Sequence, residues 1–140
     1  MNENIIDILN SLSKQTLMEA LDIRYIYAEE NLLKATMPVN NKTTQPEGIL
    51  HGGATLALCE SVGSGLSYIL IDSNQYNVVG TEINANHLRS VKQGIVTATA
   101  TLLHKGKTSH VADIKVTDEN NRLIAICRMT NRINPKNNIK

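Results

Sequence analysis

The spacing of apolar residues changes along this chain, and each spacing predicts a different element of secondary structure. Over residues 4–21 apolar side chains recur every three or four positions, which favours one or two short amphipathic helices broken around Ser11–Ser13. Residues 23–29 and 31–39 alternate between apolar and polar side chains, as half-buried strands do, and their close succession predicts a hairpin. The chain therefore begins with a helical segment over residues 1–20, followed by two strands.

A long helix is predicted next, after a loop. Asn40 and the turn-forming run Gln45–Gly48 interrupt the pattern, so we expect residues 40–50 to form the loop. From about Gly52 to Ile71 the chain is apolar on nearly every side, which is typical of a helix enclosed by the rest of a protein. This helix is the candidate centre of the fold.

Four further segments alternate with a period of two and predict strands: residues 76–91, 95–103, 109–117 and 122–133. The order is a helical segment, two strands, one long helix and four strands. This order predicts an α+β fold in which an antiparallel sheet of about six strands wraps around the long helix. We expect a single domain over residues 1–140, with a frayed tail over residues 134–140.

Composition and charge narrow the class of protein. Apolar residues make up 41% and charged residues 19%, as in globular domains. The 14 basic residues nearly balance the 13 acidic ones and are scattered along the chain, so we expect no nucleic-acid partner. The two cysteines lie in apolar stretches, the N-terminus lacks a basic leader, and polar residues interrupt the longest apolar stretch. These features predict a cytoplasmic protein that does not contact a membrane.

Glu60 is the most unusual side chain of the long helix. Glutamate is almost never fully buried without a partner, and no Lys or Arg occurs between Lys42 and Arg89. Ser64 and Ser67 follow Glu60 at i+4 and i+7 and place hydroxyl groups on the same helical face. Two interpretations remain open at this point: a carboxylate that is solvated or structurally hydrogen bonded, or one that is kept in a cavity for chemistry.

The start of this helix offers a site for an anion. At His51, Gly52 and Gly53 the unpaired N–H groups of the first turn meet the positive end of the helix dipole. Such a site stabilises the oxyanion that forms when a carbonyl carbon is attacked, although an ordinary glycine-assisted helix start has the same sequence. Gly52 and Glu60 are roughly 12 Å apart along a helix. One carbonyl group can contact both only if they come from different subunits, which predicts a homodimer with shared active sites.

Five segments of the chain carry a family pattern: LDIRY, ATMPV, QPEGILHGG, ESVGS and VVGTEINANHLRS. On these segments, from about residue 21 to residue 133, the chain resembles hotdog-fold acyl-coenzyme A thioesterases. The resemblance is strongest to the PaaI-like group and to enzymes that cleave aromatic esters such as 1,4-dihydroxy-2-naphthoyl-CoA. It implies hydrolysis of an acyl-CoA substrate to the free acid and coenzyme A, in a homodimer that pairs into a dimer of dimers, a homotetramer. Coenzyme A is part of the substrate, and no other cofactor is expected.

The resemblance also implies roles for individual residues. In that family a glutamate of the central helix attacks the thioester carbonyl or activates water, and Glu60 matches it, with Gly52 as the oxyanion donor. Four further residues match polar residues of the family. Gln45 and His51 match residues that position the thioester, Ser64 matches a hydroxyl that holds the carboxylate or water, and His87 matches a histidine near the acyl group. Five residues lie where members of the family contact coenzyme A: Arg89, Ser90, His104, Gly106 and Lys107. Polar residues exposed to solvent at the ends of strands would have the same sequence. Glu47 departs from the family pattern and the chain lacks Phe and Trp, so both aryl and medium-chain acyl groups stay open.

Other chemistries fit the same sequence less well. The four histidines are not spaced as metal ligands, so no metal is expected. Cys59 points about 100° away from Glu60 around the helix and suits a core position better than the position of a nucleophile. Two alternatives remain open: a non-catalytic acyl-CoA binding or sensing module, and a hydroxyacyl dehydratase of the same fold. The dehydratases carry an HFP-like segment that this chain lacks, and a sensor has no need of Glu60.

Overall fold

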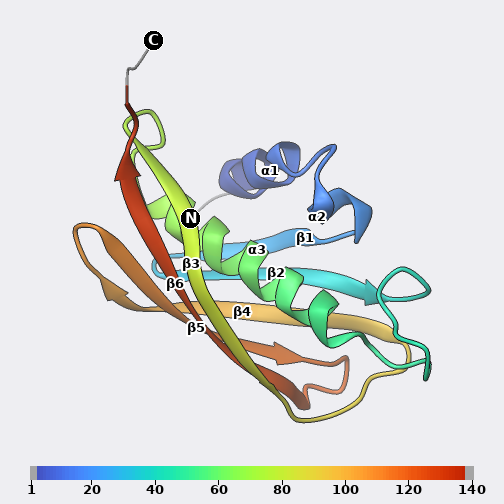
Figure 1. Cartoon of the computed structure of the whole chain (residues 1–140). Helices are drawn as coiled ribbons and strands as arrows, with labels where there is room; N and C mark the ends of the chain where they lie inside the picture. Colours follow the sequence, from blue (N-terminus) through green and yellow to red (C-terminus); the bar gives the residue numbers. More distant parts are fainter. Residues whose placement is uncertain (1–2, 138–140) are drawn as a thin grey trace.

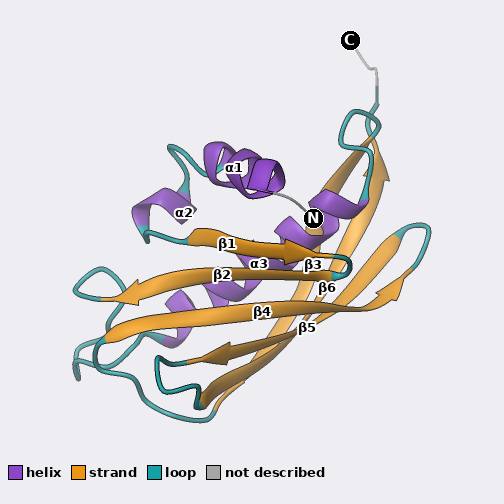
Figure 2. Cartoon of the chain, turned by 180° about the vertical axis from the view of Figure 1, so that it is seen from behind, coloured by secondary structure: helices purple, strands orange, loops and turns teal. Residues whose placement is uncertain are grey.

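The computed structural model describes residues 3–137, which form one antiparallel sheet and three helices (Figure 1, Figure 2). In the sheet the strands follow the order β1-β2-β4-β5-β6-β3, and every neighbouring pair is antiparallel. The sheet curves around α3, so the predicted α+β fold, with six strands around one long helix, is confirmed. The elements in chain order are α1 (Glu3–Leu12), α2 (Leu17–Ala20), β1 (Arg24–Glu29), β2 (Leu32–Val39), α3 (Gly52–Leu70), β3 (Tyr76–His87), β4 (Gly94–Lys105), β5 (Ser109–Thr117) and β6 (Leu123–Pro135).

The core lies between the sheet and one side of α3. In β2 and in the first half of β4 every second residue is buried, as the alternation in the sequence predicts. On β4 these residues include the small Ala98 and Ala100, which leave room for Leu58, Val62 and Leu66 of α3. Full burial of each leucine stabilises the fold by about 1.5–3 kcal/mol. This packing holds the helix at a fixed depth in the sheet.

The opposite side of α3 is less covered than the sequence suggests. Gly53 and Glu60 are exposed on this side, and Leu56, Ala57 and Ser64 are only partly buried. These residues recur every three or four positions and so form one stripe along the helix. The expected enclosure of α3 on nearly every side is therefore wrong for a single chain. A stripe that contains apolar residues and stays open in one chain is available to a second chain.

Three strand ends lie two or more residues from the prediction, among them the end of β4, which is Lys105 instead of residue 103. β3 ends at His87, earlier than expected, because the next two N–H groups bond to the carbonyl oxygen of Ile124. β6 runs on to Pro135, since Asn134 and Pro135 pair with the first residues of β3. The frayed tail expected from residue 134 is therefore wrong for these two residues, because a distant strand supplies their partners. The rest of that prediction falls partly on residues 138–140, which lie outside the described residues.

The helices α1 and α2 lie over β1 at one edge of the sheet (Figure 1). Asn10 fastens α1 to this strand, since its side chain donates to Tyr25 O and accepts from Tyr25 N–H, both at 2.9 Å. The break between the helices falls at residues 13–16, just after the predicted position, and the Thr16 hydroxyl caps α2 by accepting from Met18 N–H. Within residues 3–137 none of the helices is long and apolar enough to cross a bilayer.

Candidate active site

A pocket of about 350 Å³ lies beside the N-terminus of α3. It is formed by the loop before α3, the first turn of α3, the end of β3 and the segment that follows β3. Residues that the sequence analysis assigned to the site contribute part of its lining: Gln45, Gly52, His87, Arg89 and Ser90. The other lining residues were not singled out from the sequence: Ile49, Leu50, Thr55, Leu88 and Ile124. The fold thus brings five assigned residues from two distant segments to one hollow.

His51 caps α3 with its side chain. Its backbone is extended, with φ −70° and ψ 131°, and its Nδ1 atom accepts a hydrogen bond from Gly53 N–H at 2.8 Å. Because Nδ1 accepts, the neutral ring carries its proton on Nε2, and this exposed side chain still has one N–H to offer. The adjoining Gly52 N–H has no hydrogen-bond partner among residues 3–137, as is usual in the first turn of a helix. Two N–H donors therefore lie at the positive end of α3.

The imidazole of His87 lies against Gly52. A Cβ atom on Gly52 would be 3.0 Å from His87 Nε2 and 3.3 Å from His87 Cε1, which is closer than such atoms normally approach. The absence of a side chain at Gly52 therefore lets the imidazole and the helix N-terminus share one wall of the pocket. In the loop, Gln45 Oε1 accepts from Glu47 N–H, so the side-chain N–H groups of Gln45 remain as its donors.

Glu60 lies in the middle of α3 and is exposed in the single chain. Its carboxylate packs on Gly80 of β3, since a Cβ atom on Gly80 would be 2.8 Å from Glu60 Oε2. The register of β3 with β6 shifts just after Gly80, at a bulge that includes Thr81. Glu60 is roughly two helical turns from Gly52 and does not line the pocket at the helix N-terminus. A single chain therefore keeps the carboxylate apart from the helix N-terminus.

A second pocket, of about 310 Å³, opens beside Ser64, one turn beyond Glu60. The phenol of Tyr25 forms part of its wall and donates to Ser61 O at 2.8 Å. Burial raises the pKa of Tyr25 to about 12, so this phenol stays neutral and fixed. The wall is mainly apolar or aromatic and comes from α1, α2, α3 and β3 as well as β1: Leu9, Leu12, Met18, Gly65, Tyr68, Tyr76 and Val78. Lys136 is the charged residue of the lining, and the rest of the wall suits an apolar group.

The three assigned residues of the β4–β5 turn lie apart from both pockets. Gly106 N–H donates to Ser109 O at 2.8 Å and closes the turn. The ring of His104 packs on Gly106, where a Cβ atom would be 2.8 Å from His104 Nε2. His104 and Lys107 are exposed, and neither pocket is lined by any of the three. One chain does not join them to the rest of the assigned site.

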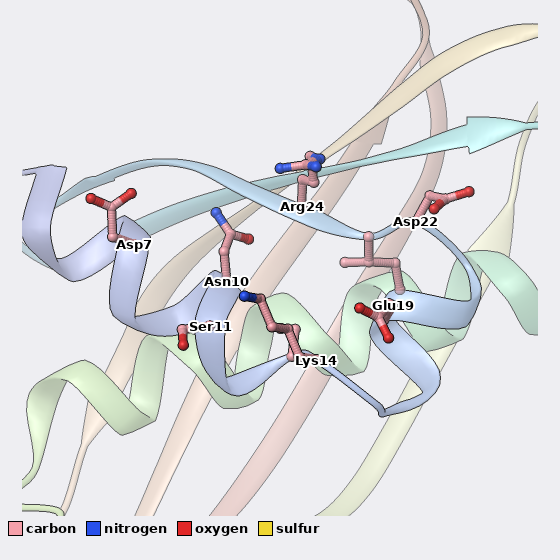
Figure 3. A pocket seen from close by; sticks show the side chains of 9 residues that line it. Asp7, Asn10, Ser11, Lys14, Glu19, Asp22 and Arg24 are labelled. Atoms are coloured by element: carbon pink, nitrogen blue, oxygen red, sulfur yellow. The ribbon is translucent and has the colours of Figure 1, made fainter.

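A third pocket, of about 310 Å³, lies between α1, α2 and the start of β1 (Figure 3). Its side chains carry charges of both signs, and several polar groups already have partners within the chain. Asp22 forms an ion pair with Lys42 at 3.0 Å, Ser13 Oγ donates to Leu9 O, and Asn10 is bonded to β1. None of the residues assigned from the sequence lines this pocket, so we place no chemistry there.

The two cysteines are buried free thiols that interact between α3 and β6. Hydrogen bonding with Cys127, together with burial, raises the pKa of Cys59 and keeps its thiol protonated. Cys59 is therefore a core group rather than an activated nucleophile. Across residues 3–137, no group of three or more His, Cys, Asp and Glu side chains is arranged to hold a metal ion.

Two features near Glu60 escaped the sequence analysis. Gly80 interrupts the strand pattern in the run VVGT, and an isolated glycine of this kind signals a bulge or a close approach, so the signal was present. Ser67 was expected beside Glu60 but is buried, where it bonds to His110 and Asn131. No local signal reveals those bonds, because the partners lie 43 and 64 residues away.

Comparison with known proteins places this geometry in a family. Residues 47–125, more than half of the chain, match the model of the Thioesterase superfamily. The chain belongs to the thioesterase superfamily. This thioesterase is 43% identical to PA1618 of Pseudomonas aeruginosa over 127 residues, which are 91% of this chain and 88% of that protein. A crystal structure of a variant of thioesterase PA1618 matches with a TM-score of 0.92 and 41% identity over 94% of both chains.

Further relatives support the resemblance inferred from the sequence. The thioesterase is 41% identical to the 1,4-dihydroxy-2-naphthoyl-CoA hydrolase of Escherichia coli over 128 residues, or 91% of this chain and 93% of that one. The structure of the E. coli PaaI protein shares the fold alone, with a TM-score of 0.77 and 22% identity over 88% of this chain and 87% of that one. The resemblance to hotdog-fold thioesterases and the class of thioester hydrolase are therefore confirmed.

Proposed function

We propose that this thioesterase hydrolyses an acyl-CoA thioester to the free acid and coenzyme A. Glu60 acts on the thioester carbonyl as nucleophile or as general base for water, and Gly52 N–H binds the oxygen as it becomes negative. One observation carries the proposal: α3 carries both an exposed carboxylate and, at a pocket, an N–H group that has no hydrogen-bond partner among the described residues. The name of the E. coli relative, a 1,4-dihydroxy-2-naphthoyl-CoA hydrolase, supports the substrate class.

The complete site is shared by two copies of the chain. β3 is an edge strand of 12 residues with one unpaired side, and Glu60 lies against it at Gly80. Pairing β3 with β3 of a second copy about a twofold axis sets the two α3 helices antiparallel along their open stripes. Gly52 of one copy then approaches Glu60 of the other, which removes the separation of roughly 12 Å within one helix. Following the family resemblance, two such dimers pair into a dimer of dimers.

The acyl group occupies the pocket beside Ser64. This serine is one turn from Glu60 on the same open stripe of α3, so a thioester carbonyl at Glu60 directs its acyl group toward this pocket. A volume of about 310 Å³ is at the lower end for ligand pockets and suits one or two fused aromatic rings or a medium-length chain. Ser64 would hold the carboxylate or the attacking water, as the family resemblance implies.

Coenzyme A lies on the opposite side of the carbonyl, along the pocket at the helix N-terminus. His51 and Gln45 offer side-chain N–H groups to the thioester, His87 lies at Gly52, and Arg89 and Ser90 form part of the pocket lining. In another copy of the chain, basic and small residues at the β4–β5 turn contact the phosphates of coenzyme A: His104, Gly106 and Lys107. The reaction needs water and no further cofactor. Two buried free thiols and an acyl-CoA substrate agree with a cytoplasmic location.

Release of free thiol from a panel of acyl-CoA esters tests the proposed function. The panel contains benzoyl-, 1,4-dihydroxy-2-naphthoyl-, hexanoyl- and palmitoyl-CoA. We expect thiol release from the aryl and medium-chain esters and little from palmitoyl-CoA, because the acyl pocket is small. A protein that binds these esters without releasing thiol is a sensing module, and one that only dehydrates hydroxyacyl-CoA is a dehydratase. Either result refutes the proposal.

The substitution Glu60→Gln tests the assigned carboxylate. It keeps the shape of the side chain and removes its charge, so we expect thiol release to fall by about a thousandfold or more while the protein stays folded. Glu82→Gln is the matched control, because Glu82 is another exposed carboxylate near Gly80 and has no assigned role. Thiol release by Glu60→Gln within about tenfold of the wild type excludes Glu60 as nucleophile or base.

A further inference from the structure

Three buried polar side chains form a hydrogen-bonded network that joins α3, β5 and β6. Ser67 on α3, His110 on β5 and Asn131 on β6 are each only 1–2% exposed. The side-chain amide nitrogen of Asn131 lies 2.8 Å from Ser67 Oγ and 3.0 Å from Gly63 O, and His110 Nδ1 lies 2.9 Å from Ser67 Oγ. Buried polar groups are costly unless they are paired, so these hydrogen bonds favour one arrangement of the three elements that they join.

The donors and acceptors of this network can be assigned. The amide of Asn131 donates to Gly63 O and to Ser67 Oγ, because the reversed amide would set two acceptor oxygens against each other at Gly63. We assign the Ser67 hydroxyl as the donor to His110 Nδ1, the arrangement in which the imidazole proton lies on Nε2. Burial, followed by the charges of Lys105 and His104, lowers the pKa of His110 and favours this neutral form. Asn131 Oδ1 remains buried without a partner within the described residues.

This network forms a hydrogen bond to α3 about one turn C-terminal to Glu60. Asn131 bonds to Gly63, which follows Glu60 by three residues, and it pairs across β6 and β3 with Gly80. Gly80 is the residue on which the Glu60 carboxylate packs. Gly63 also brings the helix close to β6, since a Cβ atom there would be 2.7 Å from the sulfur of Met129. The depth and rotation of α3 are therefore fixed at the turn that carries Glu60.

We infer that Asn131, with Ser67 and His110, is a positioning residue for Glu60: the network holds the rotation of α3 against β6 and so sets where the carboxylate meets the thioester carbonyl. The inference rests on the proposed function for its effect on hydrolysis, whereas the effect on the position of Glu60 is independent of it. A displacement of about 1 Å in a reacting group can slow a reaction by about a hundredfold. The network therefore acts on the turnover number, kcat, more than on substrate binding.

The test compares kcat and KM for thiol release by variants that are fully folded at the assay temperature. Asn131→Leu and Ser67→Ala remove hydrogen bonds at similar volume, and we expect each to lower kcat by about tenfold or more with KM within about twofold. His110→Leu removes the acceptor for Ser67 and should behave like Asn131→Leu. His110→Gln retains an acceptor oxygen and should keep kcat within about threefold of the wild type.

Asp118→Ala is the matched control, because it also removes hydrogen bonds but acts at the β5–β6 turn, where Asp118 accepts from Asn120 and Arg122. We expect it to lower the melting temperature and leave kcat unchanged. If Asn131→Leu behaves in the same way, the network is only structural and the inference is overturned.

A crystal structure of Asn131→Leu gives a readout without catalysis. We expect the Glu60 carboxylate to have moved away from Gly80, and a carboxylate that stays in place overturns the inference. If the wild type releases no thiol from any ester, the proposed function fails and this structural comparison alone decides the inference.

Discussion

The substitution Gly52→Ala separates the role of the helix N-terminus in catalysis from its role in stability. The new Cβ atom would lie 3.0 Å from His87 Nε2 and 3.3 Å from His87 Cε1, so the imidazole or the first turn of α3 must move by about 0.5–1 Å to restore ordinary contact. His87 is exposed at the end of β3 and can move at little cost. Alanine also has a higher helix propensity than glycine, by up to about 1 kcal/mol. We therefore expect an unchanged or slightly raised melting temperature.

The rate of thiol release by Gly52→Ala should fall, although the melting temperature does not. The loss of one oxyanion donor costs about 100-fold to 1,000-fold in kcat, and a displaced donor retains part of its effect. We accordingly expect kcat/KM of Gly52→Ala for thiol release to fall by about 10-fold to 100-fold. His87→Ala measures the part of this loss that comes from the imidazole, and the double variant shows whether space for the Cβ atom restores the N–H geometry. Activity of Gly52→Ala within about threefold of the wild type would refute the assignment of Gly52 as the oxyanion donor.

Two further predictions concern assembly and pH. Glu60→Ala and His51→Ala homodimers should each be inactive, and an equal mixture should regain about a quarter of wild-type thiol release, since half of the dimers are mixed and each has one intact site. No recovery despite subunit exchange, checked by native mass spectrometry, contradicts the shared site. Burial, together with Lys105 and His104 of β4, lowers the pKa of His110 in the folded chain. As the pH falls, His110 therefore binds a proton at a higher pH in the unfolded chain than in the folded chain. The free energy of unfolding should thus decrease as the pH falls below about 6.5 and level off below the native pKa. Asn131 and Ser67, which face His110 from β6 and α3, do not titrate, so thermal melts of His110→Gln should show a weaker dependence between neutral and mildly acid pH.

Most of the fold could be predicted from local spacing. The alternation in β2 and β4 identifies the strands because each is buried on the side that faces α3, and the apolar run after His51 identifies the long helix. Strand ends were predicted less well, since they depend on partners far away in sequence. Pro135 remains in β6 only because Tyr76 pairs with it, and β3 stops where two N–H groups turn to Ile124 O.

The site was predictable where its chemistry is local. His51 and Gly52 mark the helix N-terminus in the sequence, and the structure gives them a capped first turn. Ser67 was placed with Glu60 because helical spacing puts both on one face, but spacing cannot show that β5 and β6 cover that part of the face. Likewise, the contact between Glu60 and Gly80 depends on how a strand 20 residues later crosses the helix, which no local pattern contains.

The exposed edge of β3 has a consequence for how the protein must be handled. Natural edge strands are usually guarded by lysine, proline, a bulge or a covering loop. The 12 residues of β3 contain neither Lys nor Pro, and the bulge at Thr81 interrupts the edge at one point. A separated monomer would offer this edge to any other extended chain and would aggregate. If the edge is covered by a second copy, dissociation and unfolding become linked, so the melting temperature should rise with protein concentration. Dilute solutions would then lose enzyme to precipitation before the helices themselves melt.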